Sequence, residues 1–217
     1  MSIADNVKQV RQTIENCQAD QAVTLIAVTK SVGPEVANAL YAEGIRDFGE
    51  NRPEGLLEKV SALPADAKFH FIGSLQTRKV RQVIDHVVAI HSLDRLSLAE
   101  EIDKRSNRII DCFVQVNVSG EASKHGLEKE EVIPFIENCS QYRQIRVIGL
   151  MTMAPFTEEE SVLRETFREL RRLRDQIVSR AYAHAPCTEL SMGMSNDYEL
   201  AIEEGASFVR IGTVLVQ

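Results

Sequence analysis

The chain is organised around Val23-Thr24-Leu25-Ile26-Ala27-Val28-Thr29-Lys30, a largely apolar and β-branched run that ends on a lysine. A run of this composition is typical of a central parallel strand that is buried on both faces. Lys30 then lies at the carboxyl end of the strand, where α/β proteins place their functional groups. A lysine at that position is either a candidate amine nucleophile or a surface residue whose charged end reaches water.

The overall composition is that of an ordinary globular protein. The chain has 217 residues, of which 44% are hydrophobic and 26% are charged, and both values are close to the average for folded domains. No stretch rich in proline, glycine or serine divides the chain, and a domain boundary would be expected to fall in such a stretch. We therefore predict a single domain over residues 1–217.

Charge and residue spacing disfavour several classes of function. A formal net charge of −7 disfavours binding to nucleic acid or to anionic membranes. The six arginines between residues 164 and 180 are matched by acidic side chains over the same expected helix, which predicts a salt-bridged surface. The spacing of the cysteines and histidines predicts neither a disulfide framework nor a metal site. The sequence shows neither the apolar core of a signal peptide nor an apolar run long enough to span a membrane, so the expected compartment is the cytoplasm.

The alternation of strand and helix around Lys30 repeats along the chain. We predict strands at residues 23–30, 46–51, 68–75, 87–93, 109–118, 146–153, 188–192 and 208–211. Helices are expected at residues 3–17, 34–44, 53–63, 76–86, 97–105, 128–141, 158–183 and 197–204. Short connections between strands and helices indicate parallel crossover units. The predicted fold class is α/β, a single (β/α)8 TIM-type barrel with an additional N-terminal helix.

The sequence pattern leads to two further expectations about the helices and leaves one competing architecture open. No helix is expected after the eighth strand, and the N-terminal helix is expected to fill that gap. Within residues 53–63, the apolar spacing predicts that Leu56, Leu57 and Val60 face inward. An open, doubly wound sheet is the competing architecture, because it is built from the same alternation of strands and helices.

In a barrel the carboxyl ends of all strands meet on one face, where functional groups are expected. The residues there are Lys30, Glu50, Asn51, Gly73, Ser74, Ser92, Asn117 to Ser119, Thr152, Met153, Met194 to Asn196, Gly212 and Thr213. A polar loop from Ser119 to Gly126 is long enough to cover a site. The set contains one lysine but neither a carboxylate pair nor a Ser/His/Asp grouping, which disfavours glycoside hydrolysis and acyl transfer.

Two of these strand ends are suited to bind a phosphate. Ser195 lies between the seventh strand and a helix start, and Gly212-Thr213 permits close backbone approach after the eighth strand, although a tight turn would also explain each glycine. Arg210 shares a strand face with Gly212, and a buried arginine is costly unless it is paired or meets a ligand. A lysine amine, a phosphate site and an inward arginine together suggest pyridoxal 5′-phosphate held as a Schiff base on Lys30.

Several motifs resemble those of a known family. They are Ala27-Val28-Thr29-Lys30, Phe48-Gly49-Glu50-Asn51, His70-Phe71-Ile72-Gly73, Leu75-Gln76, Gln115-Val116-Asn117-Val118-Ser119, Lys124-His125-Gly126, Gly149-Leu150-Met151-Thr152-Met153, Glu189 to Asp197, and Val209-Arg210-Ile211-Gly212-Thr213. The motifs follow the family order over nearly the whole chain. The sequence therefore resembles the pyridoxal phosphate homeostasis protein family, which is similar to the N-terminal barrel of alanine racemase.

The resemblance implies a monomeric barrel that binds pyridoxal 5′-phosphate on Lys30. It further implies the following roles: phosphate contacts from Ser195, Gly212 and Thr213, a place near the pyridine nitrogen for Arg210, and a place in the pocket wall for Asn51. Members of the family are regarded as carriers or regulators in vitamin B6 and amino-acid homeostasis, without an established catalytic activity. The implied partners are the cofactor, free amino acids and apoenzymes that depend on pyridoxal phosphate.

Two other functions are kept as hypotheses. A racemase-type enzyme needs acid–base groups on both faces of the reacting adduct, and racemases similar to alanine racemase take one of them from a second domain. An arginine beside the pyridine nitrogen would also disfavour protonation of that nitrogen, which makes the ring a weaker electron sink. The third hypothesis is a sugar-phosphate barrel enzyme in which Lys30 is structural.

Overall fold

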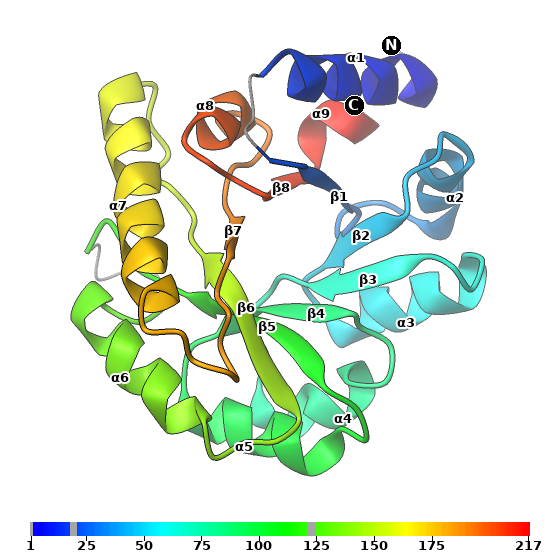
Figure 1. Cartoon of the computed structure of the whole chain (residues 1–217). Coiled ribbons are helices and arrows are strands. Elements are labelled where there is room, and N and C mark those ends of the chain that lie inside the picture. Colours follow the sequence, from blue (N-terminus) through cyan, green and yellow to red (C-terminus); the bar gives the residue numbers. More distant parts are fainter. Residues whose placement is uncertain (1, 18–20, 121–124) are drawn as a thin grey trace.

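The structure is a computed structural model in which residues 2–17, 21–120 and 125–217 are described. Within these residues, eight parallel strands close into a barrel in the order of the chain (Figure 1). They are β1 (Thr24–Val28), β2 (Asp47–Glu50), β3 (Lys68–Phe71), β4 (Ala89–Leu93), β5 (Ile110–Gln115), β6 (Ile145–Met151), β7 (Glu189–Ser191) and β8 (Phe208–Ile211). Because β1 pairs with β8, the predicted (β/α)8 barrel is confirmed and the open sheet is excluded.

Helices surround the barrel on its outer side (Figure 1). They are α1 (Ile3–Asn16), α2 (Pro34–Ala42), α3 (Pro53–Ala62), α4 (Val80–Val83), α5 (Leu96–Arg105), α6 (Lys129–Cys139), α7 (Glu160–Val178), α8 (Tyr198–Glu203) and α9 (Thr213–Val216). The helix expected over residues 76–86 is shorter than predicted. It consists of a 3₁₀ turn, η1 (Thr77–Lys79), that leads directly into α4.

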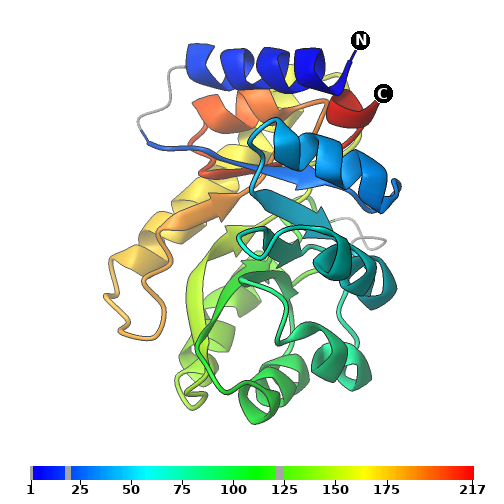
Figure 2. The same ribbon diagram turned by 90° about the vertical axis from the view of Figure 1, so that its right-hand side faces the viewer.

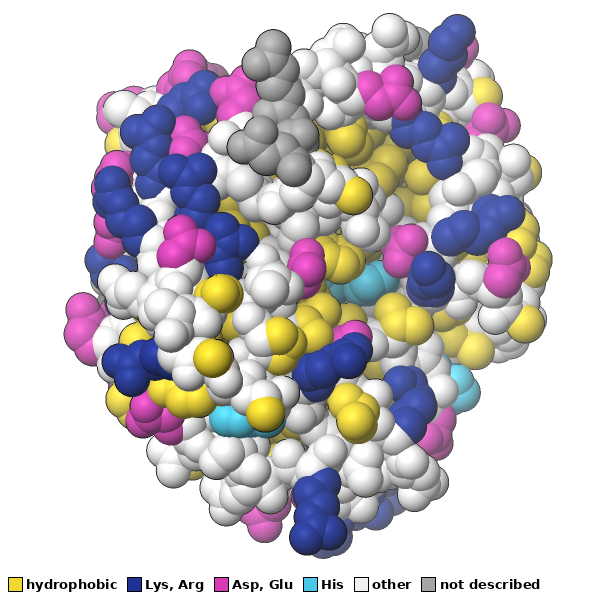
Figure 3. All heavy atoms as spheres, viewed as in Figure 1, with side chains coloured by type: hydrophobic (Ala, Val, Ile, Leu, Met, Phe, Trp, Pro, Cys, Tyr) yellow, Lys and Arg dark blue, Asp and Glu magenta, His cyan; other side chains and the backbone are white. Residues whose placement is uncertain are grey.

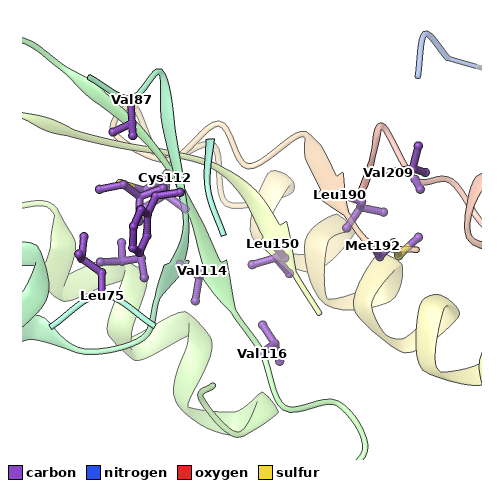
Figure 4. Packing of buried hydrophobic residues seen from close by; sticks show 14 of the residues in the cluster. Leu75, Val87, Cys112, Val114, Val116, Leu150, Leu190, Met192 and Val209 are labelled. Atoms are coloured by element: carbon purple, nitrogen blue, oxygen red, sulfur yellow. The ribbon is translucent and has the colours of Figure 1, made fainter. Parts of the chain in front are cut away.

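Side-chain alternation along each strand divides the buried core into two parts. Val114 of β5, Leu150 of β6 and Val209 of β8 belong to the larger part, between the barrel and the helices (Figure 4). Phe113 lies on the other face of β5, inside the barrel, where its ring centroid is 5.2 Å from that of Phe208. Burial on both faces explains why the strands are largely apolar in sequence.

The prediction that no helix follows the eighth strand is wrong. Gly212 turns the chain out of β8, and α9 lies beside α1 in both views (Figure 1, Figure 2). The buried Asn6 of α1 donates from Nδ2 to the carbonyl oxygens of Leu215, at 3.3 Å, and Gln217, at 3.0 Å. A helix as short as α9 shows no apolar period in the sequence, which is why the sequence did not predict it. The N-terminal helix α1 does fill the gap after the eighth strand, as expected, but it does so together with α9.

The surface of α7 carries several ion pairs, as the sequence predicted. Arg164 pairs with Glu160 at 2.7 Å, and Arg172 pairs with Glu165 at 2.9 Å. Figure 3 shows basic and acidic side chains interleaved over this helix, on the left of the view. In the described part of the chain, every helix is too short or too polar to cross a membrane.

Candidate functional site

A pocket with a volume of about 1110 Å³ lies at the carboxyl ends of the strands. Its lining includes all six residues predicted for the site, which are Lys30, Asn51, Ser195, Arg210, Gly212 and Thr213. Of the other strand-end residues, Gly73, Ser74, Met153, Met194 and Asn196 also line it, whereas Glu50, Ser92, Asn117 to Ser119 and Thr152 lie outside the lining. Closure of the barrel therefore gathers residues from both ends of the chain at one place.

Lys30 reaches the pocket because side chains alternate at the end of β1. Val28 and Lys30 both line the pocket, whereas the intervening Thr29 is fully buried. The Thr29 hydroxyl donates to Oε1 of Glu50 at 2.6 Å, which holds Thr29 on the outer face of the barrel. Lys30 is consequently directed inward, and its exposed side chain gives a ligand in the pocket access to the amine.

Glu50 and Lys59 form a buried ion pair behind the end of β1. Nζ of Lys59 lies 3.2 Å from Oε1 of Glu50, and the two side chains are 2% and 1% exposed. Gly55 makes room for the pair, because a Cβ there would lie 2.8 Å from Oε2 of Glu50. Removing one partner of such a pair leaves an uncompensated buried charge, so the pair holds Thr29 firmly. The prediction that Leu57 faces inward is wrong, since Leu57 is 37% exposed and Lys59 is buried instead.

Ser195 and Gly212 meet across the ends of β7 and β8. The N–H of Gly212 donates to Oγ of Ser195 at 3.3 Å. A Cβ on residue 212 would lie 3.3 Å from the carbonyl oxygen of Val28, so glycine allows β8 to approach β1 closely. Thr213 follows directly and also lines the pocket. Hydroxyl and backbone N–H groups gathered in this way are suited to bind an anion.

The loop that carries Ser195 is fixed at both of its ends. Gly193 has a φ of +90°, and a Cβ there would lie 2.6 Å from the Cβ of Ala201 in α8. Asp197 accepts a hydrogen bond from the N–H of Met194 at 2.6 Å, and burial raises the pKa of the Asp197 carboxyl group. The position of Ser195 is therefore set by the turn itself and by its packing on α8.

Arg210 lies inside the barrel at the floor of the pocket, on the strand face that alternation predicted. Its Nη1 donates to Oγ of Ser191 at 2.7 Å, and its Nη2 donates to the carbonyl oxygen of Thr152 at 2.9 Å. Burial lowers the pKa of Arg210 to about 10, while the charge of Asp197 acts in the opposite direction. The guanidinium group is therefore still a cation at neutral pH.

Asn51 lies in the wall formed by the ends of β2 and β3. A Cβ on Gly73 would lie only 2.4 Å from the carbonyl oxygen of Asn51, so the absence of a side chain at Gly73 allows the two strand ends to approach. This close approach explains why both residues line the same part of the pocket.

The strand-end prediction missed several residues at the pocket rim. The segment after β6 contributes Phe156, Glu158 and Glu160, and Phe156 is 97% exposed. His125, from the predicted covering loop, also lines the pocket, whereas Lys124 lies outside the described residues. The length of the covering loop indicated that it could reach the site. No sequence pattern, however, shows which side chains of an irregular segment turn toward a site.

Comparisons with known proteins agree on the family and on the fold. The sequence profile described as alanine racemase, N-terminal domain, matches residues 1–217. A pyridoxal phosphate homeostasis protein from Aquifex aeolicus is 41% identical, and the match covers 99% of this chain and 97% of that protein. Alanine racemase from Corynebacterium glutamicum has a TM-score of 0.78 at 15% identity, over 98% of this chain and 59% of the racemase chain, which shows similarity of fold alone.

The structure of PipY from Synechococcus elongatus is similar over its whole length. It has been solved without pyridoxal phosphate, with a TM-score of 0.91 to this chain, and with pyridoxal phosphate bound, with a TM-score of 0.88. Its sequence is 32% identical to this one, and each match covers 100% of both chains. From these matches and from the order of its motifs, the chain belongs to the pyridoxal phosphate homeostasis protein family, which is built on the barrel of the alanine racemase N-terminal domain.

Proposed function

We propose that this chain is a monomeric, cytoplasmic carrier of pyridoxal 5′-phosphate that acts in vitamin B6 and amino-acid homeostasis without robust catalysis. One observation carries the proposal: the six residues that the sequence predicted for the cofactor all line one pocket. The name of the relative from Aquifex aeolicus and the pyridoxal phosphate bound to PipY support it.

The lining offers a separate group for each part of the cofactor. The turn formed by Ser195, Gly212 and Thr213 is assigned to the phosphate: Ser195 and Thr213 supply hydroxyl donors, and the N–H of Gly212 donates to Oγ of Ser195 and holds that hydroxyl at the turn. Lys30 supplies an accessible amine, and Arg210 supplies a buried cation for the side of the pyridine nitrogen. When bound, the cofactor supplies an aldehyde that condenses reversibly with amines.

The pocket has room for a second small molecule. Its volume of about 1110 Å³ is larger than the range of roughly 300 to 1,000 Å³ that is typical of small-ligand sites. A free amino acid can therefore enter beside the cofactor and replace Lys30 by exchange of one amine for another. This exchange would free Lys30 and let the cofactor leave as its adduct with the amino acid, which water would then hydrolyse to the free aldehyde, without any chemistry at the α-carbon of the amino acid.

The position of Arg210 favours a carrier over an enzyme. Protonation of a ring nitrogen beside this cation would place two positive charges together, so Arg210 keeps that nitrogen unprotonated and limits electron withdrawal by the ring. A racemase-type enzyme is the second candidate function, because His125 lines the same pocket as Lys30 and offers a second group for proton transfer.

Lys30→Ala is expected to abolish the near-visible absorption that cofactor-loaded protein shows when the aldehyde is bonded to an amine. The substitution removes the amine and leaves the phosphate donors in place. The measurement is a titration of purified protein with pyridoxal phosphate, followed by absorption spectroscopy. The control is Lys68→Ala, which changes an exposed lysine at the start of β3. An unchanged absorption band in Lys30→Ala would contradict the assignment of Lys30.

Ser195→Ala is expected to weaken the binding of pyridoxal phosphate by about 1 to 3 kcal/mol, because a charge-assisted hydrogen bond to phosphate is lost. The binding of unphosphorylated pyridoxal should change much less. Dissociation constants for both compounds are measured on the variant and on Ser74→Ala, which alters a serine elsewhere in the pocket lining. Equal weakening of both compounds by Ser195→Ala would argue against a phosphate contact.

Cofactor-loaded protein is expected to exchange the α-hydrogen of alanine and other amino acids for deuterium at a negligible rate, because Arg210 limits electron withdrawal. The exchange is followed by NMR in deuterated water, with loss of the α-proton signal as the readout. A rate in the usual enzyme range of about 1 to 10³ s⁻¹ would favour the racemase-type function. In that case, loss of the exchange in His125→Ala would identify the second proton-transfer group.

A further inference from the structure

A row of hydrogen-bonded polar side chains crosses the interior of the barrel. Asp47 at the start of β2 meets Nε2 of His70 at 3.0 Å, and Nδ1 of His70 meets Nε2 of His91 at 3.0 Å. Nδ1 of His91 lies 2.8 Å from Oγ of Ser191, which accepts from Arg210 at 2.7 Å. The row therefore runs from the amino ends of the strands to the floor of the pocket, where Arg210 lies.

The two ends of the row determine the direction of every hydrogen bond in it. A guanidinium group can only donate and an ionised carboxylate can only accept. Arg210 donates to Ser191, so the Ser191 hydroxyl hydrogen is free to be donated to Nδ1 of His91. Nε2–H of His91 then donates to His70, and Nε2–H of His70 donates to Asp47. With both rings neutral, each histidine therefore carries its proton on Nε2, and the opposite direction would require an additional proton in the row.

The surroundings of His91 agree with this direction. His91 is fully buried, and its ring is stacked on Phe113 with the centroids 4.2 Å apart. Burial, followed by electrostatic interaction with His70 and with the charge of Arg210, lowers the pKa of His91 well below its usual value. A neutral imidazole has one donor and one acceptor, and the row uses both.

The row is unusual for its location. Barrel interiors are mostly filled by branched apolar side chains, and buried polar groups cost stability unless they are hydrogen-bonded. In this barrel, His70 is 3% exposed and Arg210 is 4% exposed, while the side chain of Asp47 remains 20% exposed at the other end of the row. The row thus connects the pocket to the opposite mouth of the barrel, a connection that apolar packing would not provide.

We propose that Asp47, His70, His91 and Ser191 are positioning residues that fix the guanidinium group of Arg210 at the floor of the pocket. The role for the cofactor rests on the proposed function, in which Arg210 lies beside the pyridine nitrogen. Because the Ser191 hydroxyl hydrogen is committed to His91, its oxygen lone pairs stay directed at Arg210. With the carbonyl oxygen of Thr152 holding Nη2, both ends of the guanidinium group are fixed.

The first test needs no cofactor. Nitrogen-15 NMR of the histidine rings in cofactor-free protein reports which ring nitrogen carries the proton, and His70→Gln and His91→Gln identify the signals. We expect both rings to carry the proton on Nε2 near neutral pH. A proton on Nδ1 of His91 would overturn the proposal, since the row would then run in the opposite direction.

The second test measures the guanidinium group directly. In wild-type protein free of cofactor, Arg210 should show separate, slowly exchanging Nη signals, assigned with Arg210→Lys. In Asp47→Asn these signals should average, because the charged acceptor at the end of the row is gone. The control is Asp111→Asn, since Asp111 lies near the start of β5 but pairs on the surface with Arg146 at 2.7 Å. Separate Arg210 signals in both variants would overturn the proposal.

The third test separates this inference from the proposed function. Asp47→Asn should weaken pyridoxal phosphate binding by about 3- to 10-fold and shift the absorption maximum of the bound cofactor, whereas Asp111→Asn should do neither. If wild-type protein binds no cofactor, the proposed function fails while the NMR results still decide on the row. If wild-type protein binds pyridoxal phosphate and Asp47→Asn binds it with the same affinity and the same absorption spectrum, the proposed role of the row in positioning Arg210 is wrong. Should Asp47→Asn not fold, the wild-type ring protonation remains decisive.

Discussion

The pairing of β1 with β8 is the constraint on which the pocket depends. It aligns Ile26 with Arg210 and Ala27 with Ile211, and so brings the end of the first strand beside the end of the last. Lys30 and Gly212 lie in the same pocket only because this pairing closes the barrel. In an open sheet with these two strands at different places, the amine and the anion-binding turn would not share a site.

Two buried polar networks, on opposite faces of the strands, direct the charged groups of the pocket. Outside the barrel, the ion pair of Glu50 and Lys59 holds Thr29 and thereby turns Lys30 inward. Inside the barrel, hydrogen bonds through Ser191 hold Arg210. A buried polar network stabilises a structure only when every group in it has a hydrogen-bond partner. Each of these networks therefore requires the strands and helices that carry its members to keep fixed positions. The geometry of the site is thus maintained by residues that do not themselves line it.

Local sequence patterns predicted the barrel and part of the pocket lining, because both follow from alternation and from where strands end. The same patterns could not predict interactions between distant segments. His70 and His91 are neighbours only because β3 pairs with β4, and no local pattern relates them. Likewise, apolar spacing placed Leu57 inward because it takes no account of a carboxylate such as Glu50, which makes burial of Lys59 favourable. Tertiary pairing, which overrides local preference, accounts for these differences.

The central claim is that Lys30 is the amine to which this chain binds its cofactor, and peptide mapping tests it most directly. Wild-type protein is saturated with pyridoxal phosphate, reduced with borohydride so that the bond to the amine becomes permanent, digested and analysed by mass spectrometry. The account predicts that the added mass is found on the peptide that contains Lys30. Finding it chiefly on Lys124, or on any other lysine of the native protein, would contradict the account.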